Sequence, residues 1–335
     1  MFSMRDLGIR KGSRYNLSSK NSYDEEESKW QATNLSPICI IIPTYNRAQA
    51  LKICLEHLER QSWTDFEVIV VDDGSTDTTP QQMEQYLHTG ALRLSYFRQE
   101  NSGPARARNV AISRARSPLC LIIGDDIFPA PTFVETHLKF HQENPNLWVA
   151  ALGLTQWSES GQTVTPFMRW LDESGTQFSY HDLLAGTLPN WKHFYTSNIS
   201  LKTELLRQNP FNEIFTKAAA EDLELGYRLE RQQGLKIVFL PQALAYHLHP
   251  TNLRQACKRM YVVGASMRRF HQLWPEHQIK SHQSFRGKIR DVLFRNQWLL
   301  SPLISITNVL LRVWCPNPLM KKILAYHLDS GYRSR

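Results

Sequence analysis

The sequence predicts an α/β fold with a mostly parallel central sheet, and three observations support this prediction. Short apolar runs rich in β-branched residues alternate with helical patterns in the first part of the chain. This strand–helix rhythm implies right-handed crossovers, which build parallel sheets. Polar motifs rich in carboxylates directly follow the apolar runs. The length of 335 residues allows one large α/β domain with an appendage, or two ordinary domains.

The first elements follow from periodicity. Residues 38–42 form an apolar, β-branched run that Pro43 ends, which predicts a buried strand. A helix is predicted next, because the apolar residues from Leu51 to Leu58 follow i, i+3, i+4, i+7 spacing. Pro104 suits the first turn of a later helix, since a helix start has no partner for the N–H that Pro lacks. The alternation continues with strands at 66–71, 92–97 and 119–123 and helices at 79–87 and 104–115.

The pattern becomes irregular beyond Asn144. A tryptophan-rich region over 150–215 shows no clear element, and it is followed by a helix over 221–233 and a strand over 236–240 that Pro241 ends. Basic helices are expected from Leu253 onward. The expected parts are a disordered N-terminal extension over 1–36, an α/β domain over 37–250 and a basic helical C-terminal extension over 251–335.

The formal net charge of +8 is concentrated near the C-terminus. From Thr251 to the end there are 15 Lys and Arg but three acidic residues, so this part carries about +12 and the rest about −4. Such a tail favours an anionic partner, either a membrane surface or nucleic acid. The apolar run Trp298–Trp314 is too short and interrupted to span a bilayer. Two alternatives stay open for it: a helix at an anionic membrane surface, or a helical pair packed on the domain.

The composition also bears on the compartment. A content of 42% hydrophobic and 21% charged residues is that of a folded soluble protein. The five cysteines are scattered and form no C-x-x-C pair, which argues against a zinc site and a disulfide framework and fits a reduced compartment. The start has no apolar core of a signal peptide, and no apolar run reaches about 18 residues. We expect a cytoplasmic protein, either free or peripheral at the inner face of the membrane.

Polar motifs begin at Thr44, Asp72 and Asp125, in each case at or just after the end of a predicted strand. In open parallel sheets, ligands bind beyond the carboxyl ends of the strands. We therefore expect these motifs to converge on one edge of the sheet. The chain has no G-x-G and no G-K-[ST], which excludes the dinucleotide fingerprint and the phosphate loop.

Each acidic pair has a functional and a structural interpretation. Asp125 and Asp126 follow a strongly apolar run, which favours a divalent cation site over a polar turn that caps a helix. For Asp72 and Asp73 both interpretations stay open: recognition of a nucleoside, or a turn with helix-capping residues.

A third acidic pair opens the helix predicted over 221–233. Carboxylates favour the positive end of a helix dipole, which alone could explain Glu221 and Asp222. The functional interpretation makes one of them a general base, which an ionised Asp can be near neutral pH without a large pKa shift. His247 and His249 flank an apolar residue after a strand, and alternation predicts that at most one of them reaches a metal.

Six segments, in order, resemble the inverting family-2 glycosyltransferases with the GT-A fold, over about residues 37–250. They are I-I-P-T-Y-N-R (41–47), V-V-D-D-G-S-T-D (70–77), E-N-S-G-P-A-R-A-R-N (100–109), I-I-G-D-D-I (122–127), S-N-I-S-L-K (197–202) and A-E-D-L-E-L-G-Y-R-L (220–229). The resemblance implies a GT-A fold and transfer of a sugar from a nucleotide-diphosphate sugar, a UDP-sugar in the first place, to an acceptor hydroxyl. It also implies a Mn²⁺ or Mg²⁺ cofactor.

The resemblance assigns roles residue by residue. Asp222 matches the general base, with Glu221 near it, and Asp126 matches the metal ligand of the family's D-x-D motif, whose first Asp is replaced by Gly124. His247 resembles a histidine that completes the metal site in some members. The residues that the resemblance places around the nucleotide sugar are Pro43, Thr44, Tyr45, Asp72, Asp73, Arg108 and Asp125.

The resemblance also bears on the acceptor, which we expect to be a glycan or a lipid-linked glycan. The Q-x-x-R-W motif of the processive polysaccharide synthases is absent after Asp222, which favours addition of a single sugar. Acceptor contacts are expected from the irregular region, with Trp191 and His193 as candidates.

Two other functions compete with glycosyl transfer. A sugar-phosphate nucleotidyltransferase needs a loop rich in Gly and Lys near the first strand, which 43–50 is not. A non-enzymatic protein that binds nucleic acid or membrane through its basic tail would leave the carboxylates unexplained, and no nucleic-acid partner is expected.

Overall fold

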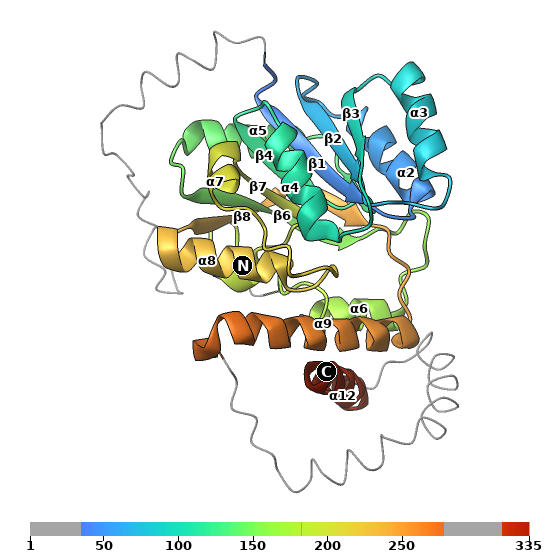
Figure 1. The fold of residues 1–335 in the computed structure, drawn as a ribbon, viewed down its shortest axis with the longest axis vertical. Coiled ribbons are helices and arrows are strands. Elements are labelled where there is room, and N and C mark those ends of the chain that lie inside the picture. The colour runs from blue at the N-terminus through green and yellow to red at the C-terminus, as the bar shows by residue number, and fades with distance from the viewer. Residues whose placement is uncertain (1–34, 182, 278–316, 335) are drawn as a thin grey trace, which may run out of the picture. The chain divides into compact units, whose positions relative to one another are not determined.

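The structure is a computed structural model that describes residues 35–181, 183–277 and 317–334. Two expectations fall outside the described residues: almost all of the N-terminal extension over 1–36, and the apolar run Trp298–Trp314. Within the described ranges an eight-stranded sheet, in the order β3-β2-β1-β4-β7-β6-β8-β5, organises the chain (Figure 1).

The first half of the sheet is parallel, as the sequence predicts. β1 pairs in parallel with β2 and β4, and β2 pairs in parallel with β3. Each strand follows the previous one through a helix, and the predicted bounds of these elements are confirmed to within three residues. The elements are β1 (Ile38–Thr44), α2 (Ala48–Leu58), β2 (Glu67–Asp72), α3 (Thr79–Thr89), β3 (Arg93–Arg98), α4 (Pro104–Arg114) and β4 (Leu119–Ile123).

The second half of the sheet is mixed. Here β7 (Asn198–Lys202) runs antiparallel to β4 and β6, and β5 (Ile127–Pro129) runs antiparallel to β8, so four of the seven pairings are parallel. The expectation of an irregular region over 150–215 was wrong for β6 (Val149–Trp157) and β7. β6 is buried over Val149–Gly153, and so short an apolar run does not by itself distinguish a strand from a helix. β7 alternates polar and apolar residues but is five residues long, and its polar side chains are buried as well.

Helices connect the strands of this half along the chain, and one of them begins at the Glu221–Asp222 pair. Pro166 stands at the N-terminus of α6, where its missing N–H costs no hydrogen bond. The helices are α5 (Phe133–Glu143), α6 (Pro166–Glu173), the 3₁₀ helix η1 (Trp191–His193), α7 (Thr203–Gln208) and α8 (Glu221–Gln233).

β8 (Lys236–His247) continues through Pro241, where the sequence predicts that a strand ends. The pairing of β8 with β6 shifts after Gly153, so three residues of β8 bulge out of the ladder and the missing N–H of Pro241 needs no partner. The Asn198 amide donates to the carbonyls of Leu154 (3.1 Å) and Ala243 (2.9 Å), one on each strand beside the shift. A Cβ on Gly153 would lie 2.4 Å from Ala243 O, so only glycine fits here.

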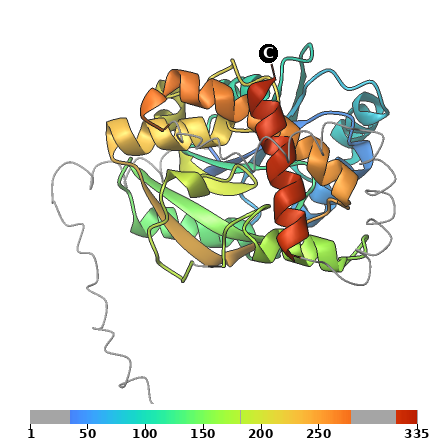
Figure 2. The same cartoon turned by 90° about the horizontal axis from the view of Figure 1, so that it is seen from below.

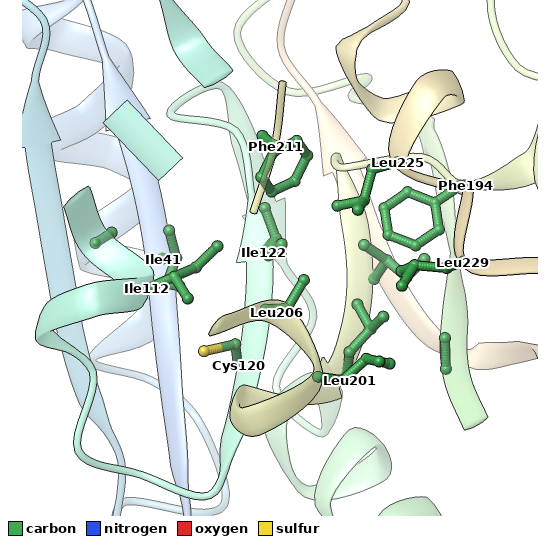
Figure 3. Packing of buried hydrophobic residues seen from close by; sticks show 14 of the residues in the cluster. Ile41, Ile112, Cys120, Ile122, Phe194, Leu201, Leu206, Phe211, Leu225 and Leu229 are labelled. Carbon is green, nitrogen blue, oxygen red and sulfur yellow. The ribbon is translucent and has the colours of Figure 1, made fainter. Parts of the chain in front are cut away.

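The main core fills one face of the sheet beneath α4, α7 and α8 (Figure 3). Ile41 from β1 and Ile122 from β4 belong to this cluster together with Leu206 from α7 and Leu225 from α8, and all four side chains are fully buried. Burial of this kind stabilises a fold by roughly 25 cal/mol per Å² of apolar surface. The packed core therefore fixes the strand ends, from which the polar motifs emerge.

The helices expected from Leu253 onward are present as α9 (Leu253–Leu273) and α12 (Asn317–Arg333). Figure 2 shows α12 crossing α9, and two glycines allow this close approach. A Cβ on Gly264 would lie 1.9 Å from Leu328 O, and one on Gly331 would lie 1.9 Å from Tyr261 O. Apolar residues of α6, α9 and α12 form one buried cluster, so the described part of the C-terminal extension packs on the α/β fold.

A buried polar network joins α5 to β7. His137 lies between Ser200 Oγ (2.8 Å) and Asn198 Oδ1 (2.9 Å), and His141 Nε2 lies 2.9 Å from Ser200 Oγ. Burial lowers the pKa of His137 to about 4 and lowers the pKa of His141 well below its usual value, with help from the charge of Lys202. Both imidazoles are therefore neutral in the folded protein at neutral pH.

Acidification should destabilise the fold through His137. Its pKa is about 4 in the folded chain against 6.5 for the ordinary side chain, so below pH 6.5 only the unfolded state takes up the proton. The resulting loss begins near pH 6.5, continues down to about pH 4, and amounts to about 2 kcal/mol at pH 5. Urea unfolding of the wild type and His137→Gln at pH 7 and pH 5 tests this. The variant should lose clearly less stability on acidification, and an equal loss in both proteins would contradict the assignment.

Candidate active site

The three motifs that follow strands do meet at one edge of the sheet, as the sequence predicts. Thr44 ends β1, Asp72 ends β2, and Asp125 follows β4. Thr44 Oγ1 donates to Asp125 Oδ2 at 2.7 Å, and the backbone N–H of Asp73 donates to Thr44 O at 2.9 Å. The carboxyl ends of β1, β2 and β4 therefore form a continuous polar rim.

Asp72 holds the turn that leaves β2. Its fully buried carboxylate accepts hydrogen bonds from Ser75 N (2.7 Å) and from the hydroxyl of Tyr96 on β3 (2.7 Å). These contacts match the structural interpretation of this residue, in which the side chain closes a turn. A contact between Asp72 and a nucleotide stays a prediction.

Asp73 ties a second loop to the rim. Its carboxylate accepts hydrogen bonds from Gln99 Nε2 (2.7 Å), Ser102 N (2.8 Å) and Gly103 N (2.8 Å). Gly103 has φ of 95°, and a Cβ there would lie 2.5 Å from Thr216 O, so glycine is required by conformation and by space. Asp73 thus sets the start of α4, and its contact with a nucleobase stays a prediction.

The loop after β1 is fastened to the turn after β2. Asn46 has φ of 54°, a conformation that Asn tolerates better than most residues. Its side-chain oxygen accepts from Thr76 N (2.7 Å) and Asp77 N (3.2 Å). Tyr45 beside it is 46% exposed, and Pro43 is half-buried, so both are open to a ligand at the rim.

Asp126, His247 and His249 form a cluster in which one ligand atom from each lies within 4.8 Å of the others. The antiparallel pairing of β5 with β8 places His247 opposite Ile127, and Leu248 N donates to Asp126 O at 2.9 Å. Asp126 Oδ2 lies 3.3 Å from His247 Nε2 and 3.2 Å from His249 Nδ1. The predicted partners Asp126 and His247 are therefore brought together.

The expectation that at most one of the two histidines reaches this site was wrong. Strand alternation would direct them to opposite faces, but β8 ends at His247 and the chain leaves strand geometry there. The ring of His249 then stacks on His247, with centroids 5.2 Å apart. The only sequence signal for His249 is its spacing from His247.

Charge distinguishes the two adjacent aspartates. Burial opposes ionisation of Asp126, but His247, His249 and Arg47 outweigh it and hold its pKa well below the usual range. Burial and the charge of Asp126 raise the pKa of Asp125 to about 7. Arg47 donates to Asp126, and its Nη2 lies 3.3 Å from His249 Nδ1.

The cluster fits a divalent transition metal. An ionised carboxylate and two imidazoles supply one oxygen and two nitrogen ligands, and Mg²⁺ prefers oxygen ligands alone. A mixed set of this kind suits a metal such as Mn²⁺ better, because carboxylates suit Mn²⁺ and imidazoles suit the transition metals. Asp125 donates no ligand to this cluster and is held by Thr44 instead.

Glu221 and Asp222 open α8, and each has a different environment. Glu221 Oε1 accepts a hydrogen bond from Arg108 Nη1 at 2.9 Å, and both side chains are buried. Burial and the charge of Glu221 raise the pKa of Asp222 to about 7, against the opposing charge of Arg108. This differs from the expectation of a base without a large pKa shift. The difference arises because sequence does not show how tightly the start of α8 is packed.

Two aromatic side chains connect the Asp126 cluster to Asp222. The ring of Phe178 lies 6.0 Å from that of His247 and 5.1 Å from that of Tyr195. The Tyr195 pKa is raised to about 12, by burial and then by the charge of Asp222. An aromatic path thus runs from His247 through Phe178 to Tyr195, whose pKa responds to Asp222, and the sequence holds no signal for these two rings beyond their aromatic character.

The candidate acceptor residues lie in different surroundings. The ring of Trp191 stacks on Phe270 of α9, with centroids 5.6 Å apart, and it packs edge-on against Tyr227. The ring of His193 lies 5.8 Å from Tyr195, beside the rim. Acceptor contacts by Trp191 and His193 stay predictions.

Comparison with known proteins identifies relatives of the chain. The family model described as glycosyl transferase family 2 matches residues 39–206, and the one described as glycosyl transferase family group 2 matches residues 155–327. Validoxylamine A glucosyltransferase from Streptomyces hygroscopicus subsp. jinggangensis is 32% identical over 234 residues, which cover 59% of this chain and 52% of that protein. Chondroitin synthase from Escherichia coli is 29% identical over 243 residues, which cover 64% of this chain and 35% of that protein. The chain thus spans about half the length, or less, of these curated relatives.

A solved structure shows the same fold. The mannosyltransferase PcManGT from Pyrobaculum calidifontis, determined in complex with GDP-Man and Mn²⁺, superposes with a TM-score of 0.56 at 19% identity. The match covers 92% of each chain, which assigns the GT-A fold to this protein. Among the described helices, none is long and apolar enough to cross a membrane.

Removal of His249 should weaken metal binding, because the cluster would lose one of its three ligands. We expect the dissociation constant for Mn²⁺ to rise at least about tenfold in His249→Ala, as for other changes close to a metal. Electron paramagnetic resonance of free Mn²⁺ measures this, and His88→Ala on the exposed end of α3 serves as the control. Equal Mn²⁺ binding by His249→Ala and the wild type would exclude His249 from the site.

Proposed function

The chain belongs to glycosyl transferase family 2, and on that premise we propose that it transfers one sugar from a nucleotide-diphosphate sugar to an acceptor hydroxyl with inversion. The observation that most supports this proposal is the Asp126–His247–His249 cluster, from which the rings of Phe178 and Tyr195 lead towards Asp222. Inverting transfer by single displacement needs a base for the acceptor and a cation for the leaving diphosphate, and no covalent nucleophile.

The donor would bind along the carboxyl ends of β1, β2 and β4. Asp126, His247 and His249 would hold Mn²⁺ or Mg²⁺, with Mn²⁺ favoured by the two nitrogen ligands. The cation supplies neutralisation of the charge on the departing diphosphate. PcManGT, which was solved with GDP-Man and Mn²⁺, supports this pairing of nucleotide sugar and metal. The residues proposed to contact the nucleoside and ribose are Pro43, Thr44, Tyr45, Asp72, Asp73 and Asp125.

Asp222 would remove the proton from the attacking acceptor hydroxyl. A pKa of about 7 leaves a large fraction of this carboxyl ionised at neutral pH while keeping it basic enough to accept a proton. Arg108 holds Glu221 through Oε1, while the buried Oε2 has no hydrogen-bond partner in the described part of the chain. Glu221 Oε2 would accept a hydrogen bond from a substrate hydroxyl, since an unpartnered buried acceptor is costly.

The acceptor would be a glycan or a lipid-linked glycan, and one sugar would be added per reaction. A cytoplasmic location with the C-terminal extension near an anionic membrane surface stays a prediction, because the run Trp298–Trp314 lies outside the described residues. UDP-sugars are proposed as donors first, and GDP-sugars form the second group to test.

A cognate nucleotide sugar should stabilise the protein only together with the metal. Ligand present at about 100 times its dissociation constant adds about 2.7 kcal/mol, which raises the melting temperature by several degrees. Thermal unfolding with a panel of UDP- and GDP-sugars, with Mn²⁺ or with EDTA, measures this. Asp126→Asn should lose the dependence on Mn²⁺. A donor effect of the same size in EDTA would contradict the metal assignment.

Replacement of the base should stop transfer without loss of donor binding. In Asp222→Asn the rate should fall by about 10²–10⁴, because the amide cannot take up the acceptor proton. The dissociation constant for the donor should stay within about twofold, since the base contacts the acceptor side. In the wild type, transfer should decline below about pH 7 as Asp222 becomes protonated. Transfer by Asp222→Asn at the wild-type rate would remove Asp222 from this role.

A further inference from the structure

The segment before α8 (residues 210–220) has an unfavourable backbone conformation at its last residue, two positions before the proposed base. Ala220 has φ of 66°, and it is 96% buried because only 4% of its surface is exposed. A left-handed conformation costs a residue with a side chain about 1–2 kcal/mol. The rest of the fold must therefore hold this segment in place, and its position decides where Asp222 points.

Two arginines of the basic helix α9 hold this segment by its backbone. Arg259 Nη1 donates to the carbonyl of Ala218, and Arg269 Nη1 donates to the carbonyl of Ile214 at 3.0 Å. Hydrogen bonds from a charged donor are stronger than those between neutral groups. The two contacts lie at both ends of one stretch of five residues, so α9 fastens this stretch along its length.

Apolar contacts join the same two elements. Phe215 from the segment, Ala220, Tyr227 from α8 and Phe270 from α9 form one buried cluster. Phe215 and Phe270 are fully buried, so this contact is part of the folded core and not a loose surface contact. The C-terminal extension therefore closes over the start of α8.

The opposite side of the segment has less support. A cavity of about 700 Å³ lies against residues 210–213 and is also lined by Arg228 and Trp274. Asn109 of α4 bonds the backbone of Phe211 in both directions, at 2.9 Å each, which anchors only the first part of the segment. Beyond it, residues 214–220 contact α9 and Tyr227 of α8, and Thr216 lies against Gly103.

We propose that α9 belongs to the catalytic unit and that Arg259 is a positioning residue, which fixes residues 216–220 and places a positive charge beside Asp222. This inference rests on the proposed function, because it gives Asp222 the role of the base. It assigns a basic residue of the C-terminal extension to the reaction itself.

The titratable groups that act on Asp222 come from three helices and from the stretch before β7. Glu221 of α8 opposes its ionisation, while Arg108 of α4 and Arg259 of α9 favour it, and Tyr195 faces it from the stretch before β7. Arg259 is exposed, so its electrostatic effect is screened by solvent and is smaller than that of the buried Arg108. Loss of the Arg259 charge should therefore raise the pH needed to ionise Asp222 by a modest amount.

The test compares Arg259→Gln and Arg259→Lys with Lys258→Gln, an exposed basic residue next to Arg259 on the same helix. In Arg259→Gln the acidic limb of the transfer rate should move up by about 0.5 pH unit, with kcat reduced and the donor KM unchanged. Arg259→Lys should restore the pH profile because it keeps the charge, and Lys258→Gln should match the wild type. An identical acidic limb in Arg259→Gln and Lys258→Gln would overturn the electrostatic role.

Hydrogen exchange separates this inference from the proposed function. Amides of residues 214–222 should exchange faster in Arg259→Gln than in Lys258→Gln, because the Ala218 carbonyl loses its donor. Equal exchange in both variants would overturn the positioning role, whether or not transfer is detected. Absence of transfer in the wild type, with faster exchange in Arg259→Gln, would reject the proposed reaction and retain the contact.

Discussion

The antiparallel pairing of β5 with β8 is the constraint on which the site depends. Asp126 and His247 are 121 residues apart in the chain, and they meet because Leu248 N donates to Asp126 O and Ile127 pairs with His247. A slip of one residue would reverse the facing of every side chain on the strand. Upstream of His247, the Asn198 amide bonds the carbonyls of Leu154 and Ala243, which lie on the two strands at the bulge in β8. Asn198 also pairs with Ile123 at the end of β4, so this residue joins the strand that precedes Asp126 to the strand that ends at His247.

The first half of the fold could be predicted because its signals are local. Each strand there is a short β-branched run followed by a helix with a clear apolar face, so periodicity was sufficient. β6 and β7 were missed because their signals are weak: the apolar run of β6 is short, and the alternation of β7 covers five residues whose polar side chains are buried between neighbouring strands. The predicted strand end at Pro241 was wrong for a related reason. Only the pairing with β6 shows that Pro241 lies in a bulge, where its missing N–H needs no partner.

The acidic pairs show which part of a site the sequence can and cannot specify. The pattern located Asp73, Asp126 and Asp222 at strand ends and a helix start, and the structure has Asp73 and Asp126 after the ends of β2 and β4 and Asp222 at the start of α8. The pattern could not distinguish their states, because these follow from partners distant in the chain. Backbone N–H groups and an amide surround Asp73, imidazoles lower the pKa of Asp126, and Glu221 with burial raises that of Asp222. Residue type alone does not show that these three carboxylates differ in their partners and in how readily they ionise.

The charge of the C-terminal extension likewise depends on contacts that the sequence alone does not show. A segment carrying about +12 suggests an anionic partner only if its charges face solvent. In α9, Arg259 and Arg269 also donate to backbone carbonyls of the segment before α8, and Arg268 donates to Ser334 O beyond α12. A carbonyl that lacks a strand or helix partner needs a donor, and a long Arg side chain can supply one from another element. Part of the basic character of the extension therefore has a structural use, and an anionic partner is not needed to explain every arginine in it.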